Sequence, residues 1–159
     1  RFRQNIKVSG ERPREGTVVV PVAYKVMMGF VKNVMIKIHR MSGNRFMGMD
    51  LLYLTTVGAR TGERRVSPVT RFPDGDRAWL VVASNNGAAR NPSWYLNLMA
   101  HPDQVSIEVD GRSMKATVEQ LEGATRDEAW QRIVATHPRF GGYQRKTSRA
   151  LPVVRLSAT

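Results

Sequence analysis

Short extended segments separated by tight turns set the strongest limit on what this chain can fold into. Three β-rich runs come first, at residues 51–57, 64–72 and 78–83. A glycine-bracketed turn separates the first two, and Pro73-Asp74-Gly75-Asp76 is a strong turn signal before the third, which is apolar enough to be buried. Strands joined by turns this short pair antiparallel, so we expect a three-strand meander.

One helix and one hairpin follow these runs. After the small, polar loop 84–91, Asn91 is the expected N-cap and Pro92 the first residue of a helix that continues through 93–99. Residues 105–109 then alternate between apolar and polar side chains, and Asp110-Gly111 is a hairpin turn that returns the chain along residues 114–118.

The C-terminal part adds a helix and a last strand. The sequence Thr125-Arg126-Asp127-Glu128 predicts a capping box that opens a helix ending near Thr136. The basic, aromatic segment 139–150 carries no predicted element, and residues 152–156 form a strand. Six short strands, mostly in hairpins with one helix inserted, indicate an α+β protein whose sheet closes into a small barrel. A Rossmann fold is disfavoured because G-x-G-x-x-G is absent. Pro68 predicts an edge or a bulge within the second strand.

Charge divides the chain into two parts. Of a net charge of +12, the first 49 residues hold ten Lys or Arg against two Glu. We therefore expect residues 1–44 to form a basic leader and an amphipathic helix at 22–41, and residues 45–159 to form the cofactor-binding barrel. The chain opens on Arg1 rather than Met, so we expect residues to precede it.

The helix at 22–41 has two readings. Lys25, Lys32, Lys37 and Arg40 lie opposite an apolar stripe, so the helix can lie on an anionic membrane surface, or it can pack on the barrel or across a homodimer. Lysines interrupt the apolar run, so it is not a transmembrane span. The expected location is cytoplasmic, with peripheral attachment to the inner face of the plasma membrane under the first reading. Nucleic acid is not an expected partner, because no helix-turn-helix, OB or RRM signature accompanies the basic composition.

The residue types needed for catalysis by the protein alone are missing. Cysteine is absent, and the three histidines are scattered. Neither H-E-x-x-H nor clustered carboxylates occur, so no metal site is expected, and no nucleophile elbow surrounds Ser93.

Two segments instead have the chemistry of an anion site. The turn at residues 58–65 carries Arg60, Arg64 and Arg65 with the hydroxyl of Thr61 between glycines. Glycine lets backbone approach a ligand, and arginine forks pair with phosphate or carboxylate oxygens. The loop 84–91 leads into a helix N-terminus, which favours anions. Trp94 follows it and can flank a planar ring, although a core tryptophan is the commoner interpretation.

These segments carry a family resemblance. In order they hold residues 54–62, 74–76, 82–84, the block 87–98 with Asn91-Pro92-Ser93-Trp94-Tyr95, residues 143–147 and residues 152–154. Residues 45–159 thereby resemble the deazaflavin-dependent nitroreductase family of actinobacteria, the quinone and nitro reductases that use coenzyme F420. The resemblance implies a split β-barrel of the flavin-reductase or pyridoxamine-oxidase type, and a bound anionic deazaflavin that reduces a small planar electrophile: a quinone, a nitro compound or an activated C=C bond such as an enone or unsaturated lactone.

The resemblance also implies the site residues. Tyr143 and Ser84 would position substrate and cofactor, and Arg60, Thr61 and Arg65 match positions that hold the cofactor phosphate. The full expected cofactor set is Thr55, Arg60, Thr61, Arg64, Arg65, Pro68, Ala83, Ser84, Asn85, Asn86, Arg90, Ser93, Trp94 and Tyr143.

Three departures and one alternative remain. Asn85 stands where lysine is common, a loss of charge that Arg90 could offset, and Thr70 and Phe140 stand where tyrosines can occur. The loss of two hydroxyls should widen the substrate pocket and make it less polar. The alternative function is a non-enzymatic relative that binds a lipid or fatty acid in the same barrel, which the retained arginines disfavour.

Overall fold

The computed structural model describes residues 45–46 and 48–159, which belong to one compact unit. The predicted leader, the helix at 22–41 and the boundary at residue 44 lie outside the described residues. Within the described part of the chain, no helix has the length and hydropathy that crossing a bilayer requires.

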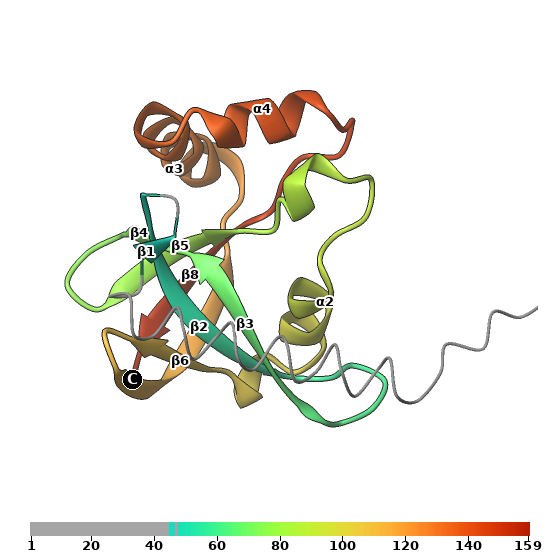
Figure 1. Ribbon diagram of the computed structural model, residues 1–159, viewed down its shortest axis with the longest axis vertical. Helices are drawn as coiled ribbons and strands as arrows, with labels where there is room; N and C mark the ends of the chain where they lie inside the picture. Colours follow the sequence, from blue (N-terminus) through green and yellow to red (C-terminus); the bar gives the residue numbers. More distant parts are fainter. Residues whose placement is uncertain (1–44, 47) are drawn as a thin grey trace, which may run out of the picture. The chain divides into compact units, whose positions relative to one another are not determined.

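Antiparallel strands form a single curled sheet (Figure 1). Every registered strand pair is antiparallel, and the order is β1-β2-β6-β7-β8-β5-β4, with β3 on the other side of β2. The strands are β1 (Arg45–Phe46), β2 (Met49–Val57), β3 (Arg64–Thr70), β4 (Phe72–Pro73), β5 (Ala78–Val82), β6 (Ser106–Val109), β7 (Arg112–Gln120) and β8 (Val153–Ala158). The predicted strands are thus confirmed in position, and β1 and β4 are added to them.

Strand β7 turns the sheet through its corner. Its first half pairs with β6 up to Lys115, and its second half pairs with β8 from Ala116 onward. The turn before it, Asp110-Gly111, has positive φ at both residues, +50° and +79°, which is the conformation of the two-residue hairpin that the sequence predicts. One strand shared between two ladders in this way makes a sheet curl into a partial barrel.

The barrel does not close between β3 and β5. Strand β3 pairs with β2 alone, while β5 pairs with β8 and with the two residues of β4. The expected meander of three consecutive strands is confirmed only in part: the second predicted run pairs with β2 over Arg64–Thr70 but meets β5 only through Phe72, which Pro73 follows in the same short ladder. The prediction for Pro68 is confirmed, because β3 is an edge that tolerates a missing N–H. This open edge, which we call the seam, makes the structure a split β-barrel with flanking helices.

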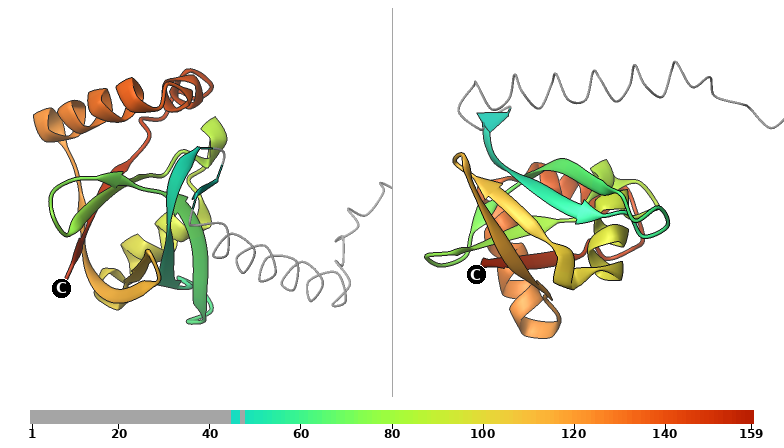
Figure 2. Two further views of the ribbon diagram at one scale, coloured as in Figure 1. Left: turned by 60° about the vertical axis from the view of Figure 1, so that its left-hand side comes forward. Right: turned by 90° about the horizontal axis from the view of Figure 1, so that it is seen from below.

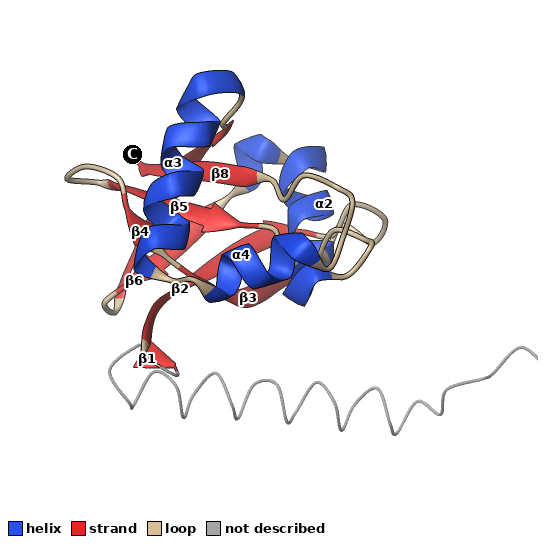
Figure 3. Ribbon diagram, turned by 90° about the horizontal axis from the view of Figure 1, so that it is seen from above, coloured by secondary structure: helices blue, strands red, loops and turns tan. Residues whose placement is uncertain are grey.

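Hydrophobic side chains fill two layers. The interior of the barrel holds a cluster that includes Leu52, Leu54 and Ile107. A second cluster lies on the outer side of β5 and β8, under the helices α3 (Gly123–Thr136) and α4 (Arg139–Arg145) (Figures 2 and 3). Strand β5 alternates between the two layers, and because both of its faces are covered it reads as one continuous apolar run.

Two helix starts differ from the predicted ones. Helix α2 (Ser93–Ala100) has Pro92, not Asn91, at its N-cap position. Helix α3 begins at Gly123, with Glu122 at the N-cap position and no side-chain cap, so the residues of the expected capping box lie inside the helix. The start moves because Leu121 donates to Val153 O in the sheet, and the helix begins as soon as the chain leaves that contact.

Helix α4 was not predicted, because Pro138 and two glycines lower the helix propensity of its sequence. Packing overrides the propensity. Phe140 is 4% exposed and meets Phe72 edge-on, with 5.3 Å between the ring centroids. A Cβ on Gly141 would lie 3.3 Å from Val134, so glycine allows α4 to approach α3 closely.

An acidic residue joins three elements of the outer layer. Asp74, in the turn before β5, accepts from Arg132 of α3 at 2.8 Å and from Arg155 of β8 at 2.6 Å. Arg155 also reaches Glu119 of β7 at 2.8 Å. Burial alone would raise the pKa of Asp74, but the hydrogen bonds and charges of the two arginines outweigh it and hold the pKa below its ordinary value.

We predict that Asp74→Asn lowers the free energy of unfolding at pH 7 by about 1–3 kcal/mol, since it removes a charge-assisted pair from two arginines. A carboxyl whose pKa is lowered by folding contributes stability above its unfolded pKa and loses it as the pH falls through the folded value. The difference from the wild type should therefore shrink below about pH 4, as denaturant titrations at pH 7 and pH 3 would measure. A difference that stays constant with pH would contradict this account.

Candidate functional site

The turn between β2 and β3 is attached to helix α2. Asn97 accepts a hydrogen bond from the N–H of Ala59 at 3.0 Å and donates to Oγ1 of the buried Thr56 at 3.5 Å. The turn closes on itself where Gly58 donates to Glu63 O at 2.8 Å. A Cβ on Gly58 would lie 2.5 Å from Thr61 Oγ1, so a larger residue here would require the Thr61 side chain to move. The basic turn is thereby held against the helix that follows the loop 84–91.

Strand geometry sends the two adjacent arginines to opposite faces. Arg65 pairs in register with Thr56, which shares the inner face with Leu54, whereas Arg64 pairs with Val57 on the outer face. Arg65 also forms an ion pair with Glu63 at 2.6 Å, with both side chains largely exposed. The two side chains therefore cannot close on one phosphate from the same side of the sheet.

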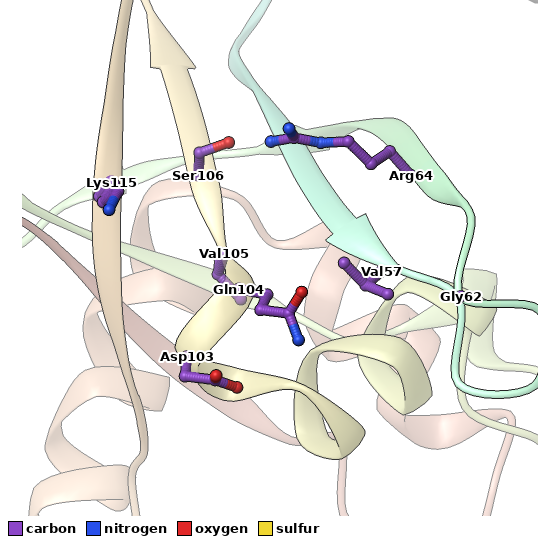
Figure 4. A pocket seen from close by; sticks show the side chains of 8 residues that line it. All are labelled: Val57, Gly62, Arg64, Asp103, Gln104, Val105, Ser106 and Lys115. Atoms are coloured by element: carbon purple, nitrogen blue, oxygen red, sulfur yellow. The ribbon is translucent and has the colours of Figure 1, made fainter.

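Arg64 lines a cavity of about 320 Å³ on the outer face (Figure 4). It extends from β3 toward Ser106 of β6, and Lys115 stands on the neighbouring strand β7. Asp103 of the short helix η2 (Pro102–Gln104) adds one carboxylate. Neither Arg64 nor Lys115 forms an ion pair with another residue of the described ranges. With two cations and one carboxylate among its lining residues, the cavity has a net positive charge that suits an acidic group.

The loop that follows β5 has an unusual backbone. Ser84 is right-handed at φ −74°, while Asn85 and Asn86 are left-handed at φ +45° and +55°, within the 3-10 turn η1 (Asn85–Gly87). A right-handed residue followed by a left-handed one turns successive N–H groups toward one point and forms an anion-binding concavity. Among the hydrogen bonds of residues 45–46 and 48–159, none uses the N–H of Asn85 or Asn86.

A distant arginine contacts this loop from behind. The guanidinium of Arg149 donates to the carbonyl oxygens of Ala83 at 3.1 Å, Ser84 at 2.9 Å, Ala88 at 2.9 Å and Arg90 at 3.3 Å. It also donates to Asn91 Oδ1 at 2.7 Å. This last bond explains the displaced start of α2, because the Asn91 side chain that would have capped the helix is taken by Arg149.

Helix α4 packs against the same loop. Tyr143 is half-buried, with its ring 5.5 Å from that of Phe140 and the ammonium of Lys146 5.8 Å from its centroid. Gly87, at φ +82°, faces this helix so closely that a Cβ would lie 2.6 Å from Tyr143 O and 2.9 Å from Lys146 Cβ. Tyr143 is thus brought beside the loop although 56 residues of chain separate it from Gly87.

The expected cofactor residues fall into two groups. The first group belongs to four segments near the seam. The loop after β5 holds Ala83, Ser84, Asn85, Asn86 and Arg90, and helix α2 begins with Ser93 and Trp94. Helix α4 contributes Tyr143, and the turn held by Asn97 carries Arg60, Thr61 and Arg65. The other group lies on the outer face of the sheet and consists of Thr55, Arg64 and Pro68. The structure does not bring this second group onto the inner face.

The departures from the family pattern have local partners. The Asn85 side chain donates to Arg90 O at 3.0 Å and holds the loop. Thr70 Oγ1 lies 3.6 Å from Met49 Sδ. Phe140 lies in the outer hydrophobic cluster against Phe72, so the tyrosine hydroxyl it lacks would have faced a packed interior.

Four residues of the site were not among those predicted. Asn97, Gly87 and Gln144 stand within the sequence blocks that carry the family resemblance, so those blocks could have pointed to them. Arg149 had no local signal, because its partners lie 58–66 residues away. Within the described residues, no three His, Cys, Asp or Glu side chains come together as a metal site.

Comparison with known proteins gives consistent matches. The family model for F420H(2)-dependent quinone reductase matches residues 30–157. An F420H(2)-dependent quinone reductase of Mycobacterium tuberculosis strain H37Rv is 40% identical over 109 residues, which cover 67% of this chain and 72% of the relative. Among solved structures, an F420-H2 dependent reductase, FDR-A, is similar with a TM-score of 0.60 and 33% identity, covering 67% of this chain and 93% of the other. A structure described as a domain-swapped dimer has a TM-score of 0.61 and 28% identity, covering 82% and 99%.

The curled antiparallel sheet, its open seam and these relatives define a split β-barrel oxidoreductase that depends on a deazaflavin. The chain belongs to the F420H(2)-dependent quinone reductase family, and its cofactor is coenzyme F420. The predicted fold class, enzyme class and cofactor are confirmed by these findings.

We predict that Gly87→Ala destabilises the protein more than Gly75→Ala does. Both substitutions place a Cβ on a residue with positive φ, which costs on the order of 1–2 kcal/mol. Only the Cβ at position 87 meets backbone, so overpacking should add about 1–3 kcal/mol there, whereas position 75 is open. Urea denaturation of the two variants measures the difference, and equal losses would show that the loop does not press on α4.

Proposed function

We propose that the loop 83–91, the start of α2 and Tyr143 hold reduced coenzyme F420 along the seam, and that the protein directs its hydride to a quinone or a related planar electrophile. The observation that carries the proposal is the pair of N–H groups at Asn85 and Asn86, which converge beside Ser84 without a partner in the described chain. Such a concavity suits an oxygen that carries negative charge. The bound deazaflavin supplies the hydride, and the residues of the chain bind, orient and shield it.

The flanking residues have distinct tasks under this proposal. Trp94 and Tyr143 offer aromatic surfaces for a planar ring system. Arg65, Arg60 and Thr61 would hold the phosphate, since the turn is fixed to α2 through Asn97. Ser84 would position cofactor and substrate from the start of the loop. The cavity beside Arg64 and Lys115 would accept acidic groups farther along the cofactor, and it gives Arg64 a role apart from that of Arg65.

The two adjacent arginines, Arg64 and Arg65, should contribute unequally to cofactor affinity. We predict that Arg65→Ala raises the dissociation constant of reduced F420 by about ten- to a hundredfold, as loss of a charge-assisted contact worth about 1.5–3 kcal/mol implies. Arg64→Ala should have a smaller effect, because Arg64 lies on the other face. Titration followed by deazaflavin fluorescence measures both constants.

The ion pair of Arg65 provides a control for that titration. Glu63→Gln removes the carboxylate that holds Arg65 at 2.6 Å, so it should leave cofactor binding unchanged or tighten it. Equal weakening by Arg64→Ala and Arg65→Ala would remove the distinction between the two faces. If the wild-type chain shows no fluorescence change with F420, the lipid-binding or fatty-acid-binding alternative is favoured instead.

The acceptor is proposed to be bulky and planar. Thr70 stands where a tyrosine can occur in related sites, so one hydroxyl fewer is available to orient a small polar substrate. Phe140 is packed in the outer hydrophobic cluster and does not bear on the acceptor. We predict that quinones, enones or unsaturated lactones are reduced faster than small nitroimidazoles. Steady-state rates with one member of each class measure this preference, and a strong preference for nitroimidazoles would contradict it.

The setting of the enzyme follows from the same proposal. Quinones reside in bilayers, so cytoplasmic protein attached peripherally through residues 22–41 would reach them. The basic residues of that segment support attachment to anionic lipid, each contributing on the order of 1 kcal/mol near the surface. The similar structure described as a domain-swapped dimer supports a homodimer. Pelleting with anionic vesicles at low salt tests the attachment, with Lys32→Gln and Lys37→Gln as the weakened variant.

A further inference from the structure

The hydrogen bonds of the Arg149 guanidinium all go to one loop, residues 83–91. Its three nitrogens donate to five acceptors: four backbone carbonyls and the Asn91 side chain, all between residues 83 and 91. A planar fork with five N–H donors can satisfy such a set, which an ammonium cannot. Arg149 lies between α4 and β8, so the contact joins the C-terminal part of the chain to the loop after β5.

Few other contacts hold the shape of the loop. Ala83 N–H donates to Pro152 O at its start, and Gly87 packs against α4. The remaining bonds are short-range, from Gly87 to Ser84 O, from Ala88 to Asn85 O and from the Asn85 side chain to Arg90 O. Asn85 and Asn86 are both left-handed, a conformation that few residues other than glycine adopt. Such a backbone persists only where its surroundings over-determine it, and Arg149 supplies that constraint.

Arg149 is itself held in place by Gln144. The Gln144 side chain donates to Arg149 O at 2.8 Å and accepts from the N–H of Leu151 at 3.0 Å. Gln144 belongs to α4, the helix that also carries Tyr143. The loop and the aromatic residue beside it are therefore positioned through one connected set of hydrogen bonds.

The acceptors of Arg149 are all neutral. No carboxylate of residues 45–46 or 48–159 forms an ion pair with it. No carboxylate of the described chain therefore neutralises its positive charge, which lies at Ser84 O, on the opposite side of the Ser84–Asn85 peptide group from the N–H of Asn85. Charge in a half-buried position is weakly screened, so it favours an anionic group on the open side of the loop.

We infer that Arg149 is the positioning residue of the cofactor site: it holds residues 83–91 in the shape that aims the Asn85 and Asn86 N–H groups, and it supplies the positive charge behind the N–H of Asn85. The inference rests on the proposed function for the identity of the ligand. The shape of the loop, however, can be measured without any ligand.

The first experiment uses the full chain without cofactor. Amide hydrogen exchange is followed at Gly87 and Ala88, whose N–H groups are bonded within the loop, and at Leu121, which is bonded in the sheet. In Arg149→Ala we expect exchange at Gly87 and Ala88 to rise at least tenfold, with little change at Leu121. The matched control is Arg71→Ala, which removes an arginine that pairs with Asp110 at the β6–β7 turn and shares no partner with the loop or with Gln144.

The second experiment measures binding of reduced F420 to the same proteins. Arg149→Ala should raise the dissociation constant about ten- to a hundredfold, and millimolar guanidinium should recover part of the loss because it can occupy the vacated place. Arg149→Lys keeps the charge without the fork, so it should bind more tightly than the alanine variant and still exchange rapidly at Gly87. This lysine variant also serves if the alanine variant fails to fold.

Two results would overturn the inference. Unchanged exchange at Gly87 and Ala88 in both Arg149 variants would show that the loop holds itself. Equal loss of protection at Leu121 would show that Arg149 serves general stability only. If the wild type does not bind F420, the proposed function fails, while the exchange data still decide whether Arg149 holds the loop.

Discussion

The open edge between β3 and β5 is the constraint on which the fold and the proposed site depend. Strand β7 divides its pairing between β6 and β8, which curls the sheet, yet β3 meets only β2 and the ring stays open. Closure would have satisfied the edge of β3 with backbone partners. Strand β4 joins β5 for two residues only, and the chain after β5 continues into the polar loop.

Side chains from distant parts of the chain fix the segments around that seam. Asn97 attaches the basic turn to α2, Arg149 attaches the loop, and Gln144 attaches Arg149 to α4. Each of these residues bonds to backbone groups of another segment, so each determines where a segment lies. A site built in this way places its N–H donors before a ligand arrives, which reduces the ordering cost of binding.

The arginines of the site do different work despite their common charge. Arg65 lies on the inner face and is paired with Glu63, Arg64 lines the outer cavity beside Lys115, and Arg149 is surrounded by neutral carbonyls. Composition and net charge alone do not distinguish these three arginines. Strand alternation and burial separate them into a candidate phosphate ligand, a candidate for more distant acidic groups and a positioning residue.

Local sequence was enough to determine much of the fold. Period-two runs and Gly, Pro and Asp turns placed the main strands, Asp110-Gly111 specified its hairpin, and Pro68 marked β3 as an edge. The blocks around Arg60 and Asn91 also indicated the family and its cofactor. These features depend on backbone geometry within a few residues, which side-chain chemistry dictates directly.

Tertiary structure alone decided the rest. It reduced the expected meander to a two-residue pairing at β5, formed α4 against its glycine content through the burial of Phe140, and sent Arg64 and Arg65 to opposite faces. In the folded chain the Asn91 side chain accepts a hydrogen bond from Arg149 and does not cap α2. In each case a local conformational preference competes with a contact to a residue tens of positions away. That contact can form only when the barrel has folded and brought the two residues together.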